Sequence, residues 1–341
     1  MRTSISDQLL TEVLQRYPLE DLRLLGTIEA SRRNDNFLVE DADGQRYVLR
    51  RYRRNVDPRR IEFQLRFQQA LRSRGFPTSD VIATETGDVL VDSEDGPWVL
   101  FSFVEGEEYD FDNPLQVQEA GRRLAEFHTT AASIAVDEVV AEENQDVQHW
   151  WAQGDKEIDG LALLFEGEDA EGDLSFLRTW LETLRSEWPF ARLNALPSGW
   201  VHGDYHGRNA VFVGDAMAGL FDFDALHHGF LIEDVALGLF MFCREYRGST
   251  RLRTDAVRLF LGGYEERLPL TESEREALPV MVALVWAPTE SYHAMLLRDG
   301  EDSLVFFRRF VYLMQELERE MERLAFELAD LPGDAFPEER P

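Results

Sequence analysis

Two polar segments, separated by a short apolar stretch, constrain this chain more than any other feature. Residues 202–209 read His-Gly-Asp-Tyr-His-Gly-Arg-Asn, and Asp222-Phe223-Asp224 follows them. The apolar runs on either side of Gly214-Asp215-Ala216 predict a hairpin between the two segments. The chain must therefore fold so that a loop and a hairpin present several carboxylate and amide oxygens together.

The residue types in these segments suit phosphoryl transfer from a nucleotide to a hydroxyl, a reaction that depends on positioning and on neutralised charge. Asp204 is the candidate catalytic residue, which accepts or orients the proton of the attacking hydroxyl. Asn209 and Asp222 are candidate ligands for Mg²⁺, which prefers hard oxygen donors. His202 is interpreted as structural support for the loop. The alternative is that Asp204 and Asp222 are only turn or capping residues, and the complete set in this order argues against it.

The first hundred residues predict a β-rich unit. Strands are expected at 22–28, 36–40, 46–52, 89–91 and 98–104, with an Asp43-Gly44 turn before the third. A helix is expected from Pro58 to Arg74, because Pro58 suits a first helical turn and apolar residues recur at helical spacing.

From about residue 113 the periodicity becomes helical. Amphipathic helices are expected near 115–127, 174–188 and 303–328. The fold class is therefore α+β, with a small β-rich N-lobe at 1–104, a hinge at 105–112 and a larger helical C-lobe at 113–331. The tail at 332–341 is expected to be flexible.

Charge and cysteine content exclude several partners and compartments. The formal net charge is −30, from 65 acidic and 35 basic residues, so the surface repels nucleic acid and anionic lipid. No run approaches the roughly 18 apolar residues of a membrane span. The single cysteine, Cys243, rules out an intrachain disulfide, which favours the cytoplasm. Lys156 is the only lysine, and both a coding bias and adaptation to high salt remain explanations for this composition.

The two polar segments resemble those of the aminoglycoside phosphotransferase and choline kinase superfamily, which shares the protein-kinase fold. Members carry a loop similar to His-Gly-Asp-x-His-x-x-Asn, followed by Asp-Phe-Asp or Asp-Phe-Glu. His206 is typical of the small-molecule kinases, whereas protein kinases usually carry Lys at that position. The resemblance implies a bilobal protein-kinase-like fold that uses ATP and Mg²⁺, with His206, Asp224 and Asp234 as supporting residues. Asp234 is interpreted as an anchor at a helix N-terminus.

The resemblance extends upstream with departures. Residues 47–50, Tyr-Val-Leu-Arg, resemble the strand that usually ends in the ATP-binding Lys, so Arg50 takes that place and Glu62 resembles its helical partner. The segment that should cover the phosphates is poor in glycine, and Ser31, Asn34 and Asn36 are its candidate phosphate contacts. Residues 34–39 and 44–49 also resemble those of type II homoserine kinases and N-acetylhexosamine kinases of the superfamily.

Candidates for substrate contact lie in the helical part, where aromatic rings and carboxylates can enclose a cationic amine. They are Trp150, Trp151, Trp286, Glu290, Tyr292 and His293. The pair His227-His228 is expected to shape the cleft, or less plausibly to bind a transition metal.

Together these features predict an ATP- and Mg²⁺-dependent phosphotransferase that acts on the hydroxyl of a small molecule. An amino alcohol, an amino acid such as homoserine, and an amino sugar or aminoglycoside remain open as acceptors. Two alternatives stay open as well: a Ser/Thr protein kinase of the stress-response type, and a pseudokinase that binds nucleotide without catalysis.

Overall fold

The computed structural model describes residues 7–28, 34–53, 57–135 and 147–329. The described residues form two compact units. The first comprises 7–28, 34–53, 57–109, 133–135 and 208–225, and the second comprises 110–132, 147–207 and 226–329. The predicted boundaries of the N-lobe, hinge and C-lobe stay a prediction.

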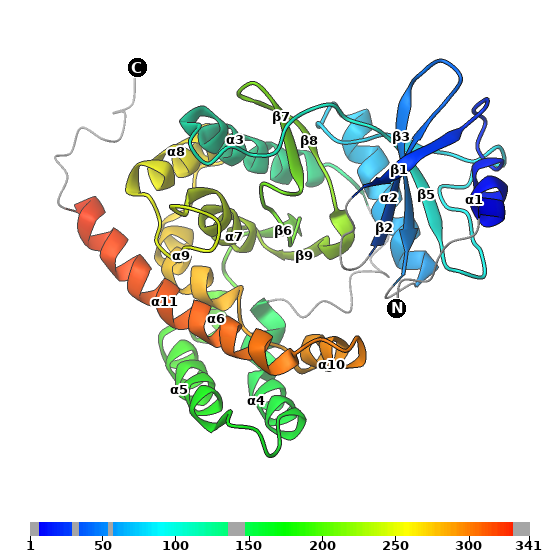
Figure 1. Cartoon of the computed structure of the whole chain (residues 1–341). Coiled ribbons are helices and arrows are strands. Elements are labelled where there is room, and N and C mark those ends of the chain that lie inside the picture. Colours follow the sequence, from blue (N-terminus) through cyan, green and yellow to red (C-terminus); the bar gives the residue numbers. More distant parts are fainter. Residues whose placement is uncertain (1–6, 29–33, 54–56, 136–146, 330–341) are drawn as a thin grey trace, which may run out of the picture. The chain divides into compact units, whose positions relative to one another are not determined.

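The first unit is built on a five-stranded antiparallel sheet with the order β1-β2-β3-β5-β4 (Figure 1). Its strands are β1 (Arg23–Ile28), β2 (Asn34–Glu40), β3 (Arg46–Tyr52), β4 (Val81–Ile82) and β5 (Trp98–Ser102). Of the predicted strands, the one at 89–91 is reduced to a single bridge between Val91 and Trp98. Polar turn residues flank this short segment, which leaves too few residues for a strand.

Two helices cover opposite faces of this sheet. Helix α1 (Asp7–Leu14) packs Leu10 and Val13 into a core with Leu49 and Trp98, and α2 (Pro58–Ser73) packs Ile61 and Leu65 against the other face. Successive residues of a strand point to opposite faces. Because Leu49 faces α1, Arg50 lies on the face of the sheet that α2 covers.

A second hairpin completes the first unit. It pairs β7 (Ala210–Val213) with β8 (Ala216–Leu220), and a short 3₁₀ turn, η2 (Phe223–Ala225), follows. The side-chain amide of Gln64 on α2 donates a hydrogen bond of 2.9 Å to the Asp224 carbonyl oxygen. The polar segment at 222–224 is therefore attached to the same helix that covers the sheet.

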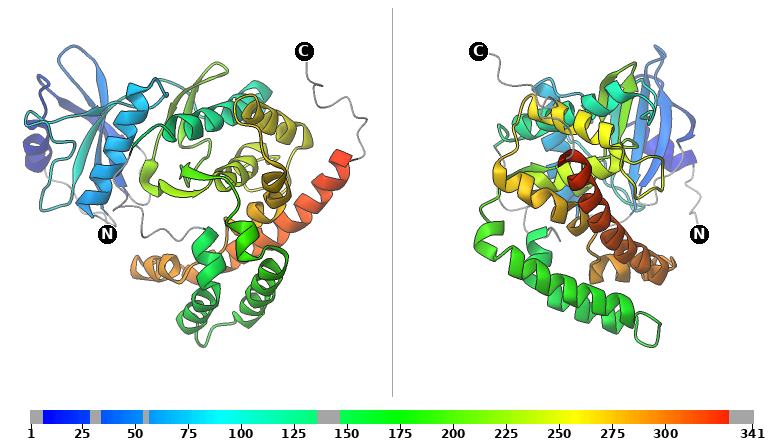
Figure 2. Two further views of the ribbon diagram at one scale, coloured as in Figure 1. Left: turned by 180° about the vertical axis from the view of Figure 1, so that it is seen from behind. Right: turned by 90° about the vertical axis from the view of Figure 1, so that its left-hand side faces the viewer.

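The second unit is mainly helical. Its elements are α3 (Pro114–Ala131), α4 (Val147–Leu164), α5 (Glu171–Glu187), α6 (Phe190–Leu193), β6 (Ser198–Val201), β9 (His227–Phe230), α7 (Leu231–Cys243), α8 (Thr254–Glu265), α9 (Glu272–Leu284), α10 (Glu290–Arg298) and α11 (Ser303–Ala329). The helices α4 and α5 lie side by side, as Figure 1 and the left view of Figure 2 show. Helix α7 is apolar almost throughout, and α3, α8 and α9 pack around it. None of the helices described is long and apolar enough to cross a membrane.

The small antiparallel sheet and the larger helical part confirm the predicted α+β class. Elements absent from the prediction include the helices α1, α4 and α6 and the strands β4, β6 and β9. The strands β6 and β9 pair with each other in antiparallel fashion, with Val201 opposite His227. The polar loop at 202–209 follows β6 and α7 follows β9, so this pairing fixes where the loop and the helix begin.

Candidate active site

In the second unit, the polar loop leaves β6 and presents one exposed carboxylate. The side chain of Asp204 is 47% exposed, whereas His202 is fully buried and the side chain of His206 is only 8% exposed. The Asp204 backbone N–H donates to His202 Nδ1 at 3.3 Å, and His206 Nε2 lies 3.3 Å from Asp204 Oδ1. Both histidines thus support the loop from inside and leave Asp204 accessible, while the catalytic role of Asp204 stays a prediction.

Asp234, in the first turn of α7, holds the start of this loop. Its carboxylate accepts hydrogen bonds from the backbone N–H groups of His202 at 2.5 Å and of Gly203 at 2.9 Å. Gly203 has a φ of 74°, which glycine adopts without strain. Burial alone would raise the pKa of Asp234, but hydrogen bonds from His128 and the His202 amide outweigh it and hold the pKa below its usual value. Asp234 therefore stays ionised and anchors the backbone beside Asp204.

A second layer of hydrogen bonds supports Asp234. His128 on α3 lies 3.2 Å from Asp234 Oδ2 through Nε2, and its Nδ1 lies 2.9 Å from the Tyr264 hydroxyl of α8. All three side chains are buried. Sequence reasoning missed His128 and Tyr264, because no local motif marks two buried residues that belong to separate helices.

In the first unit, the β7–β8 hairpin brings the candidate metal ligands to one end. The Phe221 N–H donates to the Asn209 carbonyl oxygen at 2.7 Å, just beyond the paired residues Ala210 and Leu220. Asn209 and Asp222 therefore flank the open end of the same hairpin. Asp222 has a φ of 65°, in the left-handed region that non-glycine residues seldom occupy outside special sites.

Arg50 on β3 lies between the carboxylates of this segment. Its Nη1 is 3.2 Å from Asp222 Oδ1 and 3.8 Å from Asp224 Oδ1. Burial disfavours the charged guanidinium, but Asp222, Tyr52 and Asp224 outweigh it and hold the pKa of Arg50 above its usual value. The arginine predicted in place of the usual lysine thus lies beside the predicted metal ligand.

Of the other predicted nucleotide contacts, the two asparagines lie beside Arg50 and Asp224, and Glu62 does not. Asn36 Oδ1 accepts a hydrogen bond of 3.0 Å from Arg50 Nε, and Asn34 donates one of 3.0 Å to Asp224 Oδ2. Ser31 lies outside the described residues. The carboxylate of Glu62 pairs with Arg66, one helical turn further along, so the structure does not bring it to Arg50. Glu62 lies on the exposed side of α2, whereas Gln64 is buried and reaches the 222–224 segment.

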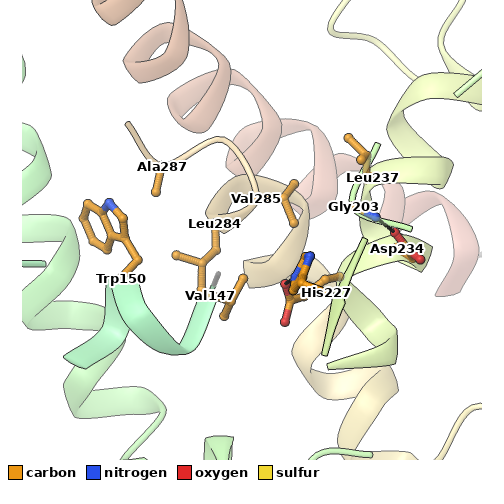
Figure 3. A pocket seen from close by; sticks show the side chains of 10 residues that line it. Val147, Trp150, Gly203, His227, Asp234, Leu237, Leu284, Val285 and Ala287 are labelled. Atoms are coloured by element: carbon orange, nitrogen blue, oxygen red, sulfur yellow. Dashed lines mark hydrogen bonds and ion pairs between the residues drawn. The ribbon is translucent and has the colours of Figure 1, made fainter. Parts of the chain in front are cut away.

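A pocket of about 140 Å³ opens beside the loop of the second unit (Figure 3). Its lining residues come from the loop, β9, α4, α7 and the C-terminal end of α9. They are Val147, Trp150, Gly203, His227, Glu233, Asp234, Leu237, Leu284, Val285 and Ala287. Gly203 immediately precedes Asp204, so the pocket adjoins the candidate catalytic residue.

Of the predicted substrate contacts, only Trp150 lines this pocket. Trp151 donates its indole N–H to the Trp188 carbonyl oxygen, and Trp286, Tyr292 and His293 pack with Phe310. The side chain of Glu290 packs against Gly160 of α4. Packing contacts of this kind and ligand contacts have the same residue types, so a sequence pattern does not distinguish them. The pocket instead includes Glu233 and His227, which lie 3.5 Å apart.

The model of the phosphotransferase enzyme family matches residues 26–270, well over half of the chain. The chain belongs to this family. It is accordingly a phosphotransferase that acts on the hydroxyl of a small molecule, which confirms the activity predicted from the sequence.

Relatives within the phosphotransferase enzyme family include two homoserine kinases. That of Caulobacter sp. (strain K31) is 30% identical over 82% of this chain and 83% of its own length. That of Chelativorans sp. (strain BNC1) is 28% identical over 92% of this chain and 95% of its own length.

Solved structures share the fold at lower identity. A microcompartment-associated aminopropanol kinase superposes with a TM-score of 0.68 at 19% identity, and covers 94% of this chain and 98% of its own. An amicoumacin kinase solved with AMP-PNP and Ca²⁺ superposes with a TM-score of 0.67 at 15% identity, over 93% of this chain and 94% of the kinase. An aminoglycoside phosphotransferase from Alicyclobacillus acidocaldarius superposes with a TM-score of 0.65 at 16% identity, over 97% of this chain and 98% of that enzyme. The protein-kinase-like phosphotransferase fold predicted from the sequence is thereby confirmed.

Proposed function

We propose that this phosphotransferase moves the γ-phosphoryl group of ATP to the hydroxyl of a small, amine-bearing molecule, with Asp204 as the catalytic residue. The observation that carries the proposal is the environment of Asp204. Its carboxylate is accessible, while the backbone before it is fixed by two hydrogen bonds to Asp234. A carboxylate held in this way can orient the acceptor hydroxyl and take its proton as the new oxygen–phosphorus bond forms and ADP leaves.

The residues of the first unit fit a divalent cation and the phosphates of a nucleotide. Asn209 and Asp222 provide the hard oxygen donors that Mg²⁺ prefers, and both flank the open end of one hairpin. The cation, when bound, neutralises charge on the phosphates. The amicoumacin kinase structure contains AMP-PNP and Ca²⁺, which supports a nucleotide and a divalent cation for this family member as well.

Arg50 is proposed to bind phosphate. Its positively charged guanidinium lies beside Asp222 and is oriented by Asn36 and Asp224. An arginine can pair with phosphate oxygens through two N–H groups at once, where a lysine offers a point charge. The homoserine kinases and the aminopropanol kinase among the similar proteins support an acceptor that carries an amine.

The test is turnover of Mg-ATP with a panel of amino alcohols, amino acids and amino sugars. We expect phosphorylation of at least one amine-bearing acceptor, and a fall in kcat of about 10²–10⁴ in Asp204→Asn. Mg-ATP should still raise the Tm of that variant, since a ligand that binds only the folded state stabilises it. Asp215→Asn, in the exposed hairpin turn, removes the same charge as a control. Undiminished turnover in Asp204→Asn would overturn the assignment.

A further inference from the structure

We infer that the pocket beside Gly203 selects a short amino alcohol that carries no carboxylate, and that Glu233 binds its ammonium group. The inference rests on the proposed function and narrows its acceptor. It follows from the charge, the size and the apolar walls of the pocket lined by the residues in Figure 3.

The polar end of the pocket is acidic. Glu233 and Asp234 are adjacent on the first turn of α7, and their side chains are 8% and 1% exposed. Asp234 already bonds the two loop amides and His128. Glu233 also lines the pocket, with His227 Nε2 3.5 Å from its Oε2, and it is the carboxylate to which we assign the ammonium.

Glu233 is held in place by its own helix. Its Oε1 accepts the Phe230 N–H at 2.7 Å, the hydrogen bond of a capping box at the start of α7. A carboxylate can accept about four hydrogen bonds, so an ammonium can bind a group that is already oriented. Orientation before binding lowers the entropy lost when the ligand is fixed.

The remaining walls of the pocket are apolar, and a hydrogen bond fixes the largest side chain among them. They come from Val147 and Trp150 on α4, Leu237 on α7, and Leu284, Val285 and Ala287 at the end of α9. The Trp150 indole N–H donates to the Pro288 carbonyl oxygen at 3.0 Å, which locks the ring. Such walls suit the short carbon chain between an ammonium and a hydroxyl.

The volume of the pocket favours a small acceptor. At about 140 Å³ it is close to a cavity of roughly 150 Å³ known to hold benzene, and well below the roughly 300–1,000 Å³ of sites for drug-sized ligands. An acceptor of about six to eight heavy atoms fills this volume, whereas most of an aminoglycoside would extend out of the pocket.

The charge of the lining residues disfavours acceptors that carry a carboxylate. None of its residues, all from the described part of the chain, is Arg or Lys. A carboxylate on the acceptor would be buried beside two carboxylates, Glu233 and Asp234. The only lining side chain that can carry a positive charge is His227, which already lies 3.5 Å from Glu233, so binding of such an acceptor is strongly unfavourable. Homoserine carries such a carboxylate, and homoserinol replaces it with a second hydroxymethyl group.

The experiment measures kcat/KM with Mg-ATP for three acceptors: homoserinol, homoserine and the uncharged 1,4-butanediol. We expect homoserinol to exceed each of the others at least tenfold. In Glu233→Gln, whose amide oxygen can still accept the Phe230 N–H, the homoserinol-to-butanediol ratio should fall at least tenfold, mainly through KM. Glu272→Gln removes one exposed carboxylate from α9 and should leave the ratio unchanged.

A second variant keeps the test decisive if Glu233→Gln does not fold. Val285→Phe narrows the pocket without changing its charge, and should raise the KM for homoserinol at least tenfold. Preference of the wild-type enzyme for homoserine, an unchanged ratio in a folded Glu233→Gln, or an unchanged KM in Val285→Phe overturns the inference while the phosphotransferase activity stands. If the wild-type enzyme phosphorylates none of these acceptors or the wider panel, the proposed function fails and the inference with it.

Discussion

Asp222 combines an unusual backbone conformation with a charge that Arg50 balances. Its φ of 65° lies where most L-residues are disfavoured by about 1–2 kcal/mol, although Asp and Asn adopt it with less strain. A residue held in this conformation beside a buried cation is typical of a ligand-binding position. The backbone and the charge make separate contributions, and substitution can separate them.

Asp222→Asn keeps a side chain that tolerates this backbone and removes the charge. We expect it to abolish most of the rise in Tm that Mg-ATP causes, because Asp222 is both the proposed metal ligand and the partner of Arg50. Asp222→Ala should in addition lower the free energy of unfolding by about 1 kcal/mol. The control is Asp21→Ala, since Asp21 is an exposed residue with a φ of 51°. A full Mg-ATP response in Asp222→Asn would contradict the metal assignment.

His293 makes stability depend on pH. It is fully buried among Phe165, Phe307 and Phe310, and burial lowers its pKa to about 4, despite a hydrogen bond with Ser303 that opposes the shift. The unfolded chain takes up this proton near pH 6.5 and the folded chain only near pH 4. Stability from His293 is thus present above about pH 6.5 and is lost as the pH falls toward 4.

Between pH 7.5 and pH 5, this residue should account for about 2 kcal/mol of lost unfolding free energy. The measurement is urea unfolding of the wild type and His293→Phe at both pH values. The variant should lose less stability on acidification than the wild type. Equal losses in the two proteins would show that His293 is not the group that titrates.

Site residues could be predicted from the sequence where they stand close together in one motif. They could not be predicted where tertiary packing decides the direction of the side chain. Asp204, Asn209 and Asp222 stand at fixed spacing within one stretch, so the sequence identified them as candidates together. Glu62 and Gln64 differ only in which side of α2 they occupy, and the packing of that helix decides it. Glu233 lies beside Asp234, yet its direction into the pocket depends on how β9 passes into α7.

At the scale of elements, two glycines set the approach of α3 and α8. A Cβ at Gly121 would lie 1.9 Å from the Phe260 carbonyl oxygen, and a Cβ at Gly263 would lie 2.1 Å from that of Gln118. Both contacts are with backbone, which cannot turn aside. Since α3 carries His128 and α8 carries Tyr264, the spacing of these helices also sets the hydrogen bonds behind Asp234.

Gly263→Ala should therefore lower the free energy of unfolding by about 3 kcal/mol, because the helices must separate. The neighbouring Gly262 has open space around its Cα, so Gly262→Ala should raise it by about 0.8 kcal/mol through helix propensity alone. Thermal and urea unfolding of both variants measure the difference. Similar effects of the two substitutions would show that helix contact is not what Gly263 provides.

Elements with strong periodicity could be predicted, as could the short β7–β8 hairpin, whose turn separates two apolar runs, whereas short strands that pair over a long separation could not. The strand at Arg46–Tyr52 and the helices at 58–73 and 303–329 follow from their apolar spacing. The strands β6 and β9 have four residues each and pair across a gap of 25 residues (202–226), so no local signal marks them. Helix α1 is formed by eight residues whose apolar side gains its stability from the sheet.

For the whole molecule, the charge imbalance should govern the response to salt. A net charge of −30 repels itself more in the compact state than in the expanded one, and dissolved ions screen that repulsion. We expect the Tm to rise between about 0.02 and 1 M NaCl. Differential scanning calorimetry at a fixed pH measures it, with equal osmolality of sucrose as control. A Tm that falls with NaCl would mean that screening of ion pairs outweighs the relief of repulsion.

The single cysteine has a practical consequence. Cys243 ends α7, the helix that carries Glu233 and Leu237, and it is fully buried, which raises the pKa of its thiol. A thiol reagent can modify it only when this helix opens to solvent, so the labelling rate under native conditions reports the free energy of that opening. An acceptor that binds against α7 must slow the labelling. The wild-type protein thus contains its own probe of acceptor binding, which requires neither turnover nor an added fluorophore.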